Sequence, residues 1–151
     1  MSDLRDLYQE VILDHSRQPR HFRALEPPCC SAEGQNPLCG DTLRVFLRTE
    51  GDRISEATFQ GSGCAISMAS ASMMTEAVRG ATIAEAERKY TAFHDLVTGG
   101  TDFETAGPEL GKLAVFAGVS KFPVRVKCAT LAWHTLNAAM DGEDNDPVTT
   151  E

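Results

Sequence analysis

The sequence predicts an α+β fold, in which a small antiparallel β-sheet, a hairpin with at most one additional edge strand, is packed by several helices. Three observations support this. Strand-like alternation of apolar and polar residues is confined to residues 42–61, whereas helical spacing occurs near the N-terminus and again after residue 64. A chain of 151 residues that is 42% hydrophobic is long enough to bury one core. Strands early and helices late indicate α+β rather than alternating βαβ units.

The first expected element is an amphipathic helix at the N-terminus. Ser2 is suited to cap it, and Pro19 requires the helix to end before that position. Residues 20–41 then contain three prolines, so this irregular stretch allows at most a short edge strand. The apolar positions that define the helix recur at i, i+3, i+4, i+7 and i+8, and they are Leu4, Leu7, Tyr8, Val11 and Ile12.

A β-hairpin is expected next, over residues 42–61. Val45 and Leu47 alternate with arginines before the turn, and Ala57 and Phe59 continue the apolar pattern after it. Gly51 and Asp52 supply a tight connection between the two strands.

Four helices are expected after the hairpin. The first follows Cys64 and is stopped by Gly80, and the second opens at the capping-box sequence "TIAE" and runs to about Phe93. In the third, Pro108 suits the first turn, and Gly118 ends the helix. The last helix is expected to start near Cys128, after Pro123.

Charge and composition restrict the class of protein. The net charge is −8, but five acidic residues and no basic ones fall in residues 141–151, which we expect to be a disordered acidic tail after a domain over residues 1–140. Nucleic-acid binding requires clustered positive charge, and the sequence has no such cluster, so we expect no nucleic-acid partner. The chain has no run of about 18 apolar residues, and its N-terminus lacks the pattern of a signal peptide, so we expect no membrane partner and a cytoplasmic location.

The five cysteines indicate metal or thiol chemistry rather than disulfides, because their number is odd and the expected location is reducing. Cys39 and Asp41 lie two apart at the entry to a strand, where side chains two apart point the same way. Cys64 lies at an expected helix start, where free N–H groups favour a thiolate. Cys128 also lies at an expected helix start, directly after Lys127 and near Arg125, whose positive charges favour a thiolate. Each cysteine by itself is explained by packing. All three lie at loop-to-element junctions, however, and Gly40, Gly61 and Gly63 allow close approach of the backbone at two of these junctions, which suggests a common site.

Cys39, Asp41, Cys64 and Cys128 together form a four-donor set suited to tetrahedral zinc. Such a centre carries a net charge of −2, so cations nearby, such as Arg125 or Lys127, would help to offset it. The same thiolates suit an iron–sulfur cluster, and spacing does not separate the two. The aspartate favours a site that opens, since a structural zinc site is normally closed by cysteine or histidine.

Four motifs in order resemble the iron–sulfur cluster assembly scaffold family, of the IscU and NifU N-terminal type, over nearly the whole chain up to Met140. They are "LYQEVILDHSRQPRHF", "NPLCGD", "GSGCAIS" and "VSKFPVRVKCATLAW". The resemblance implies a compact α+β fold with helices on one side of a small sheet, and a site of Cys39, Asp41, Cys64 and Cys128.

Within that family the chain resembles most the SufU branch. An inserted stretch, residues 89–107, and Lys127 before the last cysteine are the matching features. The resemblance implies a zinc-bound acceptor of persulfide sulfur from a SufS-type cysteine desulfurase, with Cys39 as the acceptor. It leaves open whether the chain acts as a sulfurtransferase-like enzyme or a non-enzymatic scaffold.

A purely structural zinc domain is one alternative, and two others remain. One is an IscU-type scaffold that assembles a [2Fe–2S] cluster and passes it to other assembly partners. The other, of a different class, is a cysteine-dependent hydrolase that pairs Cys64 or Cys128 with a histidine. Lys121, Arg125 and Lys127 offer positive charge to an acidic partner surface. Cys29, Cys30 and His134 are expected to be loop or packing residues.

Overall fold

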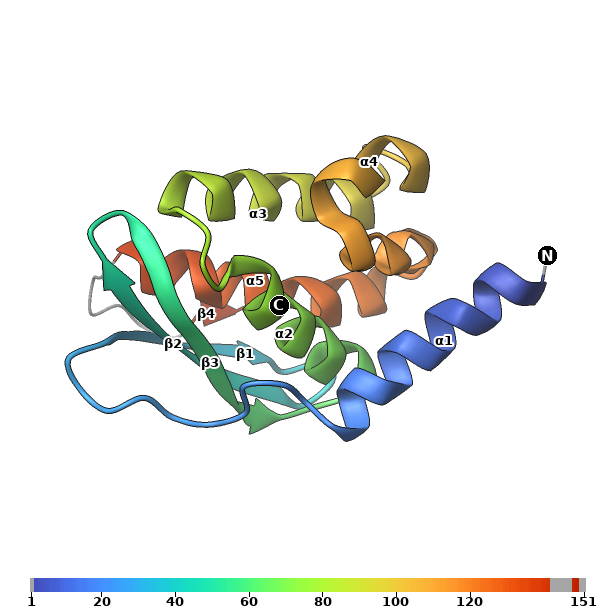
Figure 1. The fold of residues 1–151 in the computed structure, drawn as a ribbon. Helices are drawn as coiled ribbons and strands as arrows, with labels where there is room; N and C mark the ends of the chain where they lie inside the picture. Colours follow the sequence, from blue (N-terminus) through green and yellow to red (C-terminus); the bar gives the residue numbers. More distant parts are fainter. Residues whose placement is uncertain (1, 142–147, 150–151) are drawn as a thin grey trace.

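The computed structural model describes residues 2–141 and 148–149. Its elements follow one another as a helix, three strands, a series of helices and a final short strand (Figure 1). They are α1 (Ser2–Arg17), β1 (Cys30–Asn36), β2 (Asp41–Glu50), β3 (Arg53–Ser62), α2 (Ala65–Val78), α3 (Ile83–Val97), α4 (Phe103–Leu110), the 3₁₀ helix η1 (Gly111–Lys121), α5 (Pro123–Asp141) and β4 (Val148–Thr149).

The sheet has the strand order β3-β2-β1-β4. The three long strands are antiparallel, and the predicted hairpin is confirmed, with Glu50 opposite Arg53 across the turn. β1 is a full seven-residue strand where only a short one was expected, because its prolines flank the strand rather than interrupt it. β4 pairs with β1 in parallel, so that Gly34 lies opposite Val148.

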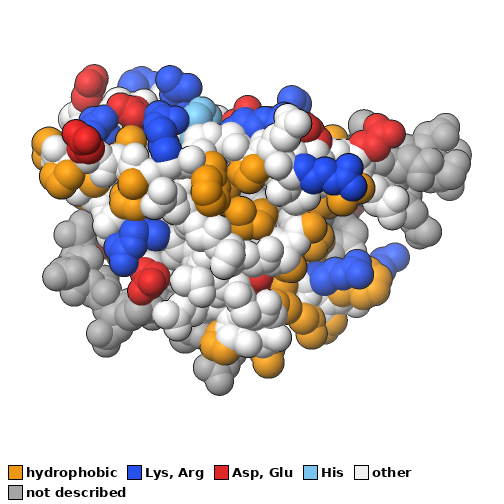
Figure 2. Space-filling view, turned by 90° about the horizontal axis from the view of Figure 1, so that it is seen from below, with side chains coloured by type: hydrophobic (Ala, Val, Ile, Leu, Met, Phe, Trp, Pro, Cys, Tyr) orange, Lys and Arg blue, Asp and Glu red, His pale blue; other side chains and the backbone are white. Residues whose placement is uncertain are grey.

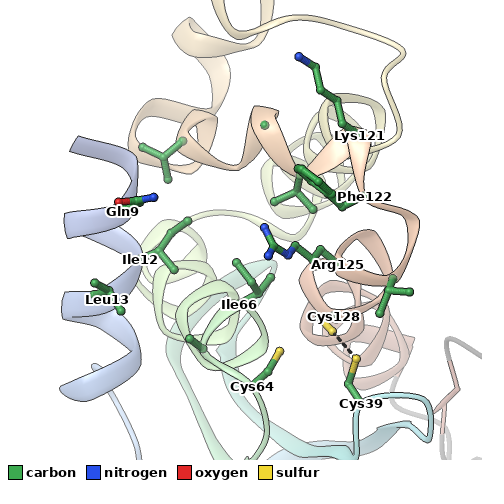
Figure 3. Close-up of a pocket in the computed structure, with 15 residues that line it drawn as sticks. Gln9, Ile12, Leu13, Cys39, Cys64, Ile66, Lys121, Phe122, Arg125 and Cys128 are labelled. Atoms are coloured by element: carbon green, nitrogen blue, oxygen red, sulfur yellow. Dashed lines mark hydrogen bonds between the residues drawn. The ribbon is translucent and has the colours of Figure 1, made fainter. Parts of the chain in front are cut away.

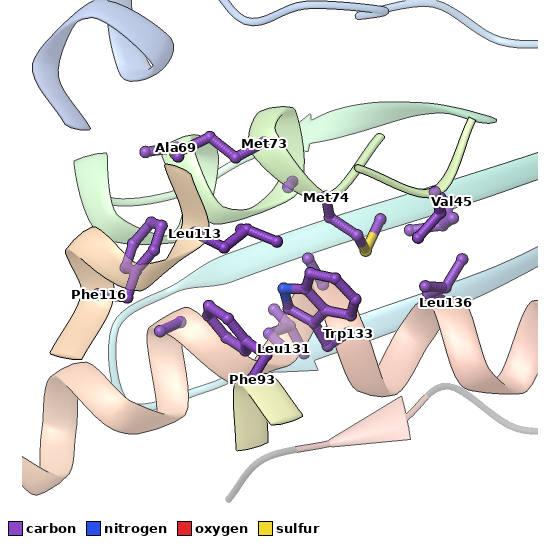
Figure 4. Packing of buried hydrophobic residues seen from close by; sticks show 14 of the residues in the cluster. Val45, Ala69, Met73, Met74, Phe93, Leu113, Phe116, Leu131, Trp133 and Leu136 are labelled. Carbon is purple, nitrogen blue, oxygen red and sulfur yellow. The ribbon is translucent and has the colours of Figure 1, made fainter. Parts of the chain in front are cut away.

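Helices α2 to α5 gather above the sheet in Figure 1, where α5 and α2 lie between the sheet and α3, and α1 extends to the right of them. α5 packs directly on β1 and β2, and a side chain at Gly34 would collide with Thr135 Oγ1 of that helix. Trp133 is 1% exposed and stacks on Phe93, with ring centroids 5.0 Å apart (Figure 4). The core therefore joins α5 to the sheet below it and to α3 above it, which fixes the position of the residues at the start of α5.

Local signals predicted α2 and α3 well. α2 ends at Val78, just before Gly80, whose φ of +83° is the left-handed conformation of a helix stop. The capping box of α3 is present, with the Thr82 hydroxyl accepting a 3.1 Å hydrogen bond from the Glu85 N–H. The helix continues to Val97, one turn beyond the predicted end.

Two predicted helix starts were wrong. α4 begins at Phe103, because the Asp102 side chain caps it by accepting from the Thr105 N–H at 2.8 Å, and Pro108 lies inside the helix. α5 begins at Pro123, five residues before Cys128, because proline is well suited to the first helical position. Gly118 does not end a helix either, since η1 runs through it to Lys121.

The predicted acidic tail lies mostly outside the described residues. Within it the structure describes Asp141 as the end of α5 and Val148–Thr149 as β4, and the disorder expected for residues 142–147 and 150–151 stays a prediction. None of the described helices has the length and apolar character needed to cross a membrane.

Candidate metal centre

Cys39 and Asp41 are brought together by the loop of residues 37–40 between β1 and β2. Cys39 lies in this loop, Asp41 is the first residue of β2, and Gly40 between them has a φ of +69°. Their convergence was predicted from alternation along an extended strand and from Gly40 as a pivot, and the structure has the pivot but not the extended backbone. The chain turns at Gly40, and glycine adopts that left-handed conformation without strain.

Cys64 is the N-cap residue of α2, as its position after "GSG" predicted. Its backbone N–H donates a hydrogen bond of 2.9 Å to Asp41 Oδ1. Gly63, the residue before Cys64, must lack a side chain, because a Cβ at this position would collide with Asp41 Oδ1. The end of β3 and the start of β2 therefore meet at Asp41.

Cys128 lies in the second turn of α5 and is 2% exposed. The prediction that it sits at a helix start was wrong, so the helix N-terminus does not favour its thiolate. Instead, burial raises the pKa of the Cys128 thiol, and its contacts with the Cys39 and Cys64 thiols and the Asp41 carboxylate raise it further.

The structure brings Cys39, Asp41 and Cys128 into one cluster. One ligating atom of each lies within 4.8 Å of the other two, and Cys128 donates a 3.1 Å hydrogen bond to Cys39 Sγ (Figure 3). Cys64 is outside this group of three, but its thiol contacts Cys128 and lines the same cavity. All four predicted donors thus converge, with Cys64 at the edge.

The donor set fits a soft dication. Sulfur atoms bound to one tetrahedral zinc ion lie about 3.8 Å apart, and the cluster already holds its donors at that scale. Ionising three thiols beside a buried carboxylate is unfavourable without a compensating cation, as the raised pKa of Cys128 indicates. The cluster therefore suits a metal cation bound by cysteine and aspartate.

Sequence reasoning missed Asn36, the last residue of β1. Its side chain donates to Asp41 Oδ2 at 3.1 Å and to Cys128 Sγ at 3.5 Å, and the residue is fully buried. The only sequence signal was its place at the start of "NPLCGD". The contact to Cys128 spans 92 positions and is invisible to local patterns.

A cavity of about 1050 Å³ adjoins the cluster. Arg125 lines it and lies over the Phe122 ring, with the guanidinium carbon 4.8 Å from the ring centroid (Figure 3). Lys121 lines it too, whereas Lys127 is half-buried and, within the described part of the chain, is not among the lining residues. The apolar part of the wall comes from Ile12, Leu13, Ile66, Val115, Val119, Phe122 and Val124.

The histidines have other contacts. His134 is half-buried, as predicted, and its Nδ1 lies 2.8 Å from the Tyr90 hydroxyl. His15 and His21 contact the hydroxyls of Ser72 and Thr75 on α2. Among the described residues, no histidine is hydrogen-bonded to a cysteine, so the geometry gives no support to a cysteine–histidine hydrolase.

Comparison with known proteins gives consistent relatives. The chain is 40% identical over 143 residues to the zinc-dependent sulfurtransferase SufU of Bacillus subtilis (strain 168), covering 95% of each chain. It is also 40% identical over 145 residues to the iron–sulfur cluster assembly scaffold protein IscU of Streptococcus pyogenes serotype M1, covering 96% of this chain and 89% of the relative. The two identities are equal, so they do not separate the SufU and IscU branches.

A solved structure shares the fold. It is described as an iron–sulfur cluster assembly scaffold protein for the SUF system from Fervidobacterium islandicum AW-1, with a TM-score of 0.80 and 34% identity over 87% of this chain and 94% of that chain. The profile of the NifU-like N terminal domain family matches residues 7–141, which include all four donors. The chain therefore belongs to the NifU-like N-terminal domain family, which the motifs around its cysteines predicted.

Proposed function

We propose that the chain is a SufU-type, zinc-bound sulfur acceptor, which takes persulfide sulfur from a SufS-type cysteine desulfurase for iron–sulfur cluster assembly. The observation that carries the proposal is the convergence of Cys39, Asp41 and Cys128 within 4.8 Å, beside a cavity that Cys64 also lines. The zinc-dependent relative from Bacillus subtilis supports the choice of metal. Lys127 and the stretch 89–107, which resemble the SufU branch, support the choice of branch.

Cys39 is the proposed acceptor. It lies in a loop and is partly exposed, whereas Cys128 is 2% exposed and Cys64 caps a helix. Zinc bound to the four donors would hold the cysteines as thiolates at neutral pH. The loop position leaves the Cys39 sulfur accessible to a partner, and Gly40 gives the backbone beside it freedom to move.

The proposed reaction is a thiol–persulfide exchange. The Cys39 thiolate attacks the terminal sulfur of the desulfurase persulfide, and a new sulfur–sulfur bond forms at Cys39 Sγ. The sulfur–sulfur bond on the desulfurase breaks, and its cysteine leaves as a thiolate. The exchange is balanced in electrons and needs no external oxidant or reductant.

The cavity beside the cluster is the proposed docking surface for the desulfurase. Val124 and Phe122 on its wall are 54% and 49% exposed, and Lys121 and Arg125 add positive charge. Figure 2 shows the lower face of the molecule, where hydrophobic side chains lie beside Lys and Arg side chains toward the α1 end. Exposed apolar side chains bordered by cations suit a partner surface with an apolar centre and acidic rim.

Metal analysis of natively purified protein, combined with a desulfurase assay with and without the chain, tests the proposal. We expect about one zinc per chain and a faster turnover of cysteine by the desulfurase. The proposal would be contradicted if the purified protein contained no zinc and did not change the turnover of the desulfurase. A zinc-loaded chain without effect on the desulfurase would instead indicate a purely structural metal site.

A [2Fe–2S] scaffold is the second candidate, favoured by the equal identity to the IscU protein of Streptococcus pyogenes. The same cysteines would hold the cluster. Reconstitution under anaerobic conditions separates the two functions. A stable cluster that transfers to an apo-protein supports the scaffold, and zinc that resists displacement by iron supports the sulfur acceptor.

A further inference from the structure

Asn36 occupies a position that connects the donors of the candidate metal centre. It ends β1 and lies directly opposite Asp41 in the antiparallel register, so these two residues flank the loop that carries Cys39. The side chain is fully buried. A polar side chain with no exposure is retained in a fold only where its hydrogen bonds compensate for the loss of water.

The contacts of Asn36 reach three of the four donors. Its side-chain nitrogen donates to Asp41 Oδ2 at 3.1 Å and to Cys128 Sγ at 3.5 Å. Its backbone carbonyl accepts from the Cys39 N–H at 3.3 Å. One residue of β1 is therefore tied to β2, to the loop and to α5.

The other end of the amide indicates that Asn36 does not serve the fold alone. Its Oδ1 is buried and, among the described residues, has no hydrogen-bond partner. An unpaired buried acceptor is destabilising by about 1–3 kcal/mol, so an apolar residue of the same size would relieve that penalty. An apolar residue, however, could not supply the N–H groups that Asn36 donates to Asp41 and Cys128.

Asp41 is held from both sides. Oδ1 accepts from the Cys64 N–H at 2.9 Å, and Oδ2 accepts from the Asn36 side chain. Each carboxylate oxygen can accept more than one hydrogen bond or ligand interaction, so both keep capacity for a metal ion. The two donors fix the plane of the carboxylate, whereas the Asn36 amide alone also reaches the sulfur of Cys128.

We propose that Asn36 is a positioning residue of the metal centre. Its amide orients Asp41 and Cys128 before the metal ion binds. The inference rests on the proposed metal centre and adds a residue to it. Hydrogen-bond partners of metal ligands typically account for 10- to 100-fold in affinity. Loss of the Asn36 amide therefore weakens zinc binding by about that factor without removing a ligand.

The test compares Asn36→Leu, which keeps the volume and removes both donors, with Asn36→Ala and with the unaltered chain. Zinc dissociation constants are measured by competition with a chromophoric chelator. Visible spectra of the Co²⁺-substituted proteins report the geometry at the donors. Ile54→Val, a core change at the far end of β3, is the matched control for a loss of stability alone, of about 0.5–1.5 kcal/mol.

We expect about 10- to 100-fold weaker zinc binding and an altered Co²⁺ spectrum for both Asn36 variants, with the Ile54→Val protein like the unaltered chain. If the zinc affinity and the Co²⁺ spectrum of Asn36→Leu were unchanged, the proposed role of Asn36 would be overturned, and the proposed function would still stand. Equal weakening in Ile54→Val would also overturn it, since general stability would then explain the effect. Absence of metal binding by the unaltered chain would overturn the proposed function itself.

Discussion

Replacing Gly63 by alanine should weaken zinc binding, although Gly63 has no side chain to contribute. A Cβ at this position would collide with Asp41 Oδ1 and would lie 3.0 Å from Asp41 Cγ, where ordinary contact begins near 3.4 Å. The carboxylate and the Gly63 backbone must therefore separate by roughly 0.6 Å or more, because real Cβ atoms essentially never come closer than 3.0 Å to another heavy atom. That movement also disturbs the 2.9 Å hydrogen bond from the Cys64 N–H.

The expected loss is about 10- to 100-fold in zinc affinity, the usual effect of disturbing the support of a metal ligand, or about 1.4–2.7 kcal/mol. Competition with a chelator measures it, and thermal unfolding of the metal-free protein checks that the fold persists. Gly107→Ala is the matched control, because a Cβ there meets nothing within 4 Å. Zinc affinity of Gly63→Ala within twofold of that of Gly107→Ala would refute the close approach of Gly63 to the donors.

Three further predictions follow from the contacts. Asp41→Ala should lose zinc, whereas His134→Ala should keep it, because His134 contacts Tyr90 rather than the cluster; metal content after gel filtration distinguishes them. Cys128→Ser should lower zinc content, while Cys29→Ser should not, since the Cys29 thiol donates a hydrogen bond to the Leu25 carbonyl oxygen and lies outside the cluster; equal losses would contradict the assignment. Burial lowers the pKa of His15 below its usual 6.5, so below pH 6.5 the unfolded chain binds more protons than the folded one. The free energy of unfolding should therefore fall as the pH drops below 6.5. In urea titrations the slope of this fall should be smaller for His15→Gln than for the unaltered chain, by at most about 1.4 kcal/mol per pH unit.

Features encoded by neighbouring residues could be predicted from the sequence. The turn at Gly51, the capping box of Thr82 and Glu85, and the place of Cys64 before a helix all depend on residues within a few positions. Each was correct because the hydrogen bonds that fix it are local.

The start of α5 shows why other features escaped. Pro123 is compatible with the end of a loop or with the first turn of a helix, and the structure has the second. As a result Cys128 was placed at a helix start, whereas it lies one turn further on and is buried. Its raised pKa then comes from burial and neighbouring donors, which no local pattern contains.

The donors themselves were predicted from their chemistry and family resemblance, but the groups that support them were not. Asn36 meets Cys128 across 92 positions, and the reason for Gly63 is its contact with Asp41, 22 residues earlier in the chain. Such contacts depend on the register of β1 with β2 and on the packing of α5 against these two strands. They become visible only when the fold is complete.

Transfer of sulfur to Cys39 is tested most directly by mass spectrometry of the alkylated chain. The zinc-loaded protein is incubated with a SufS-type desulfurase and L-cysteine, then alkylated and cleaved after Glu33 by a glutamate-specific protease, which separates Cys39 from Cys29 and Cys30. We expect the mass of one added sulfur atom on the peptide that contains Cys39, and none on the peptide that contains Cys29 and Cys30. Added sulfur on the latter peptide alone, or none on the chain while the desulfurase persulfide persists, would contradict a sulfur-accepting metal centre at Cys39.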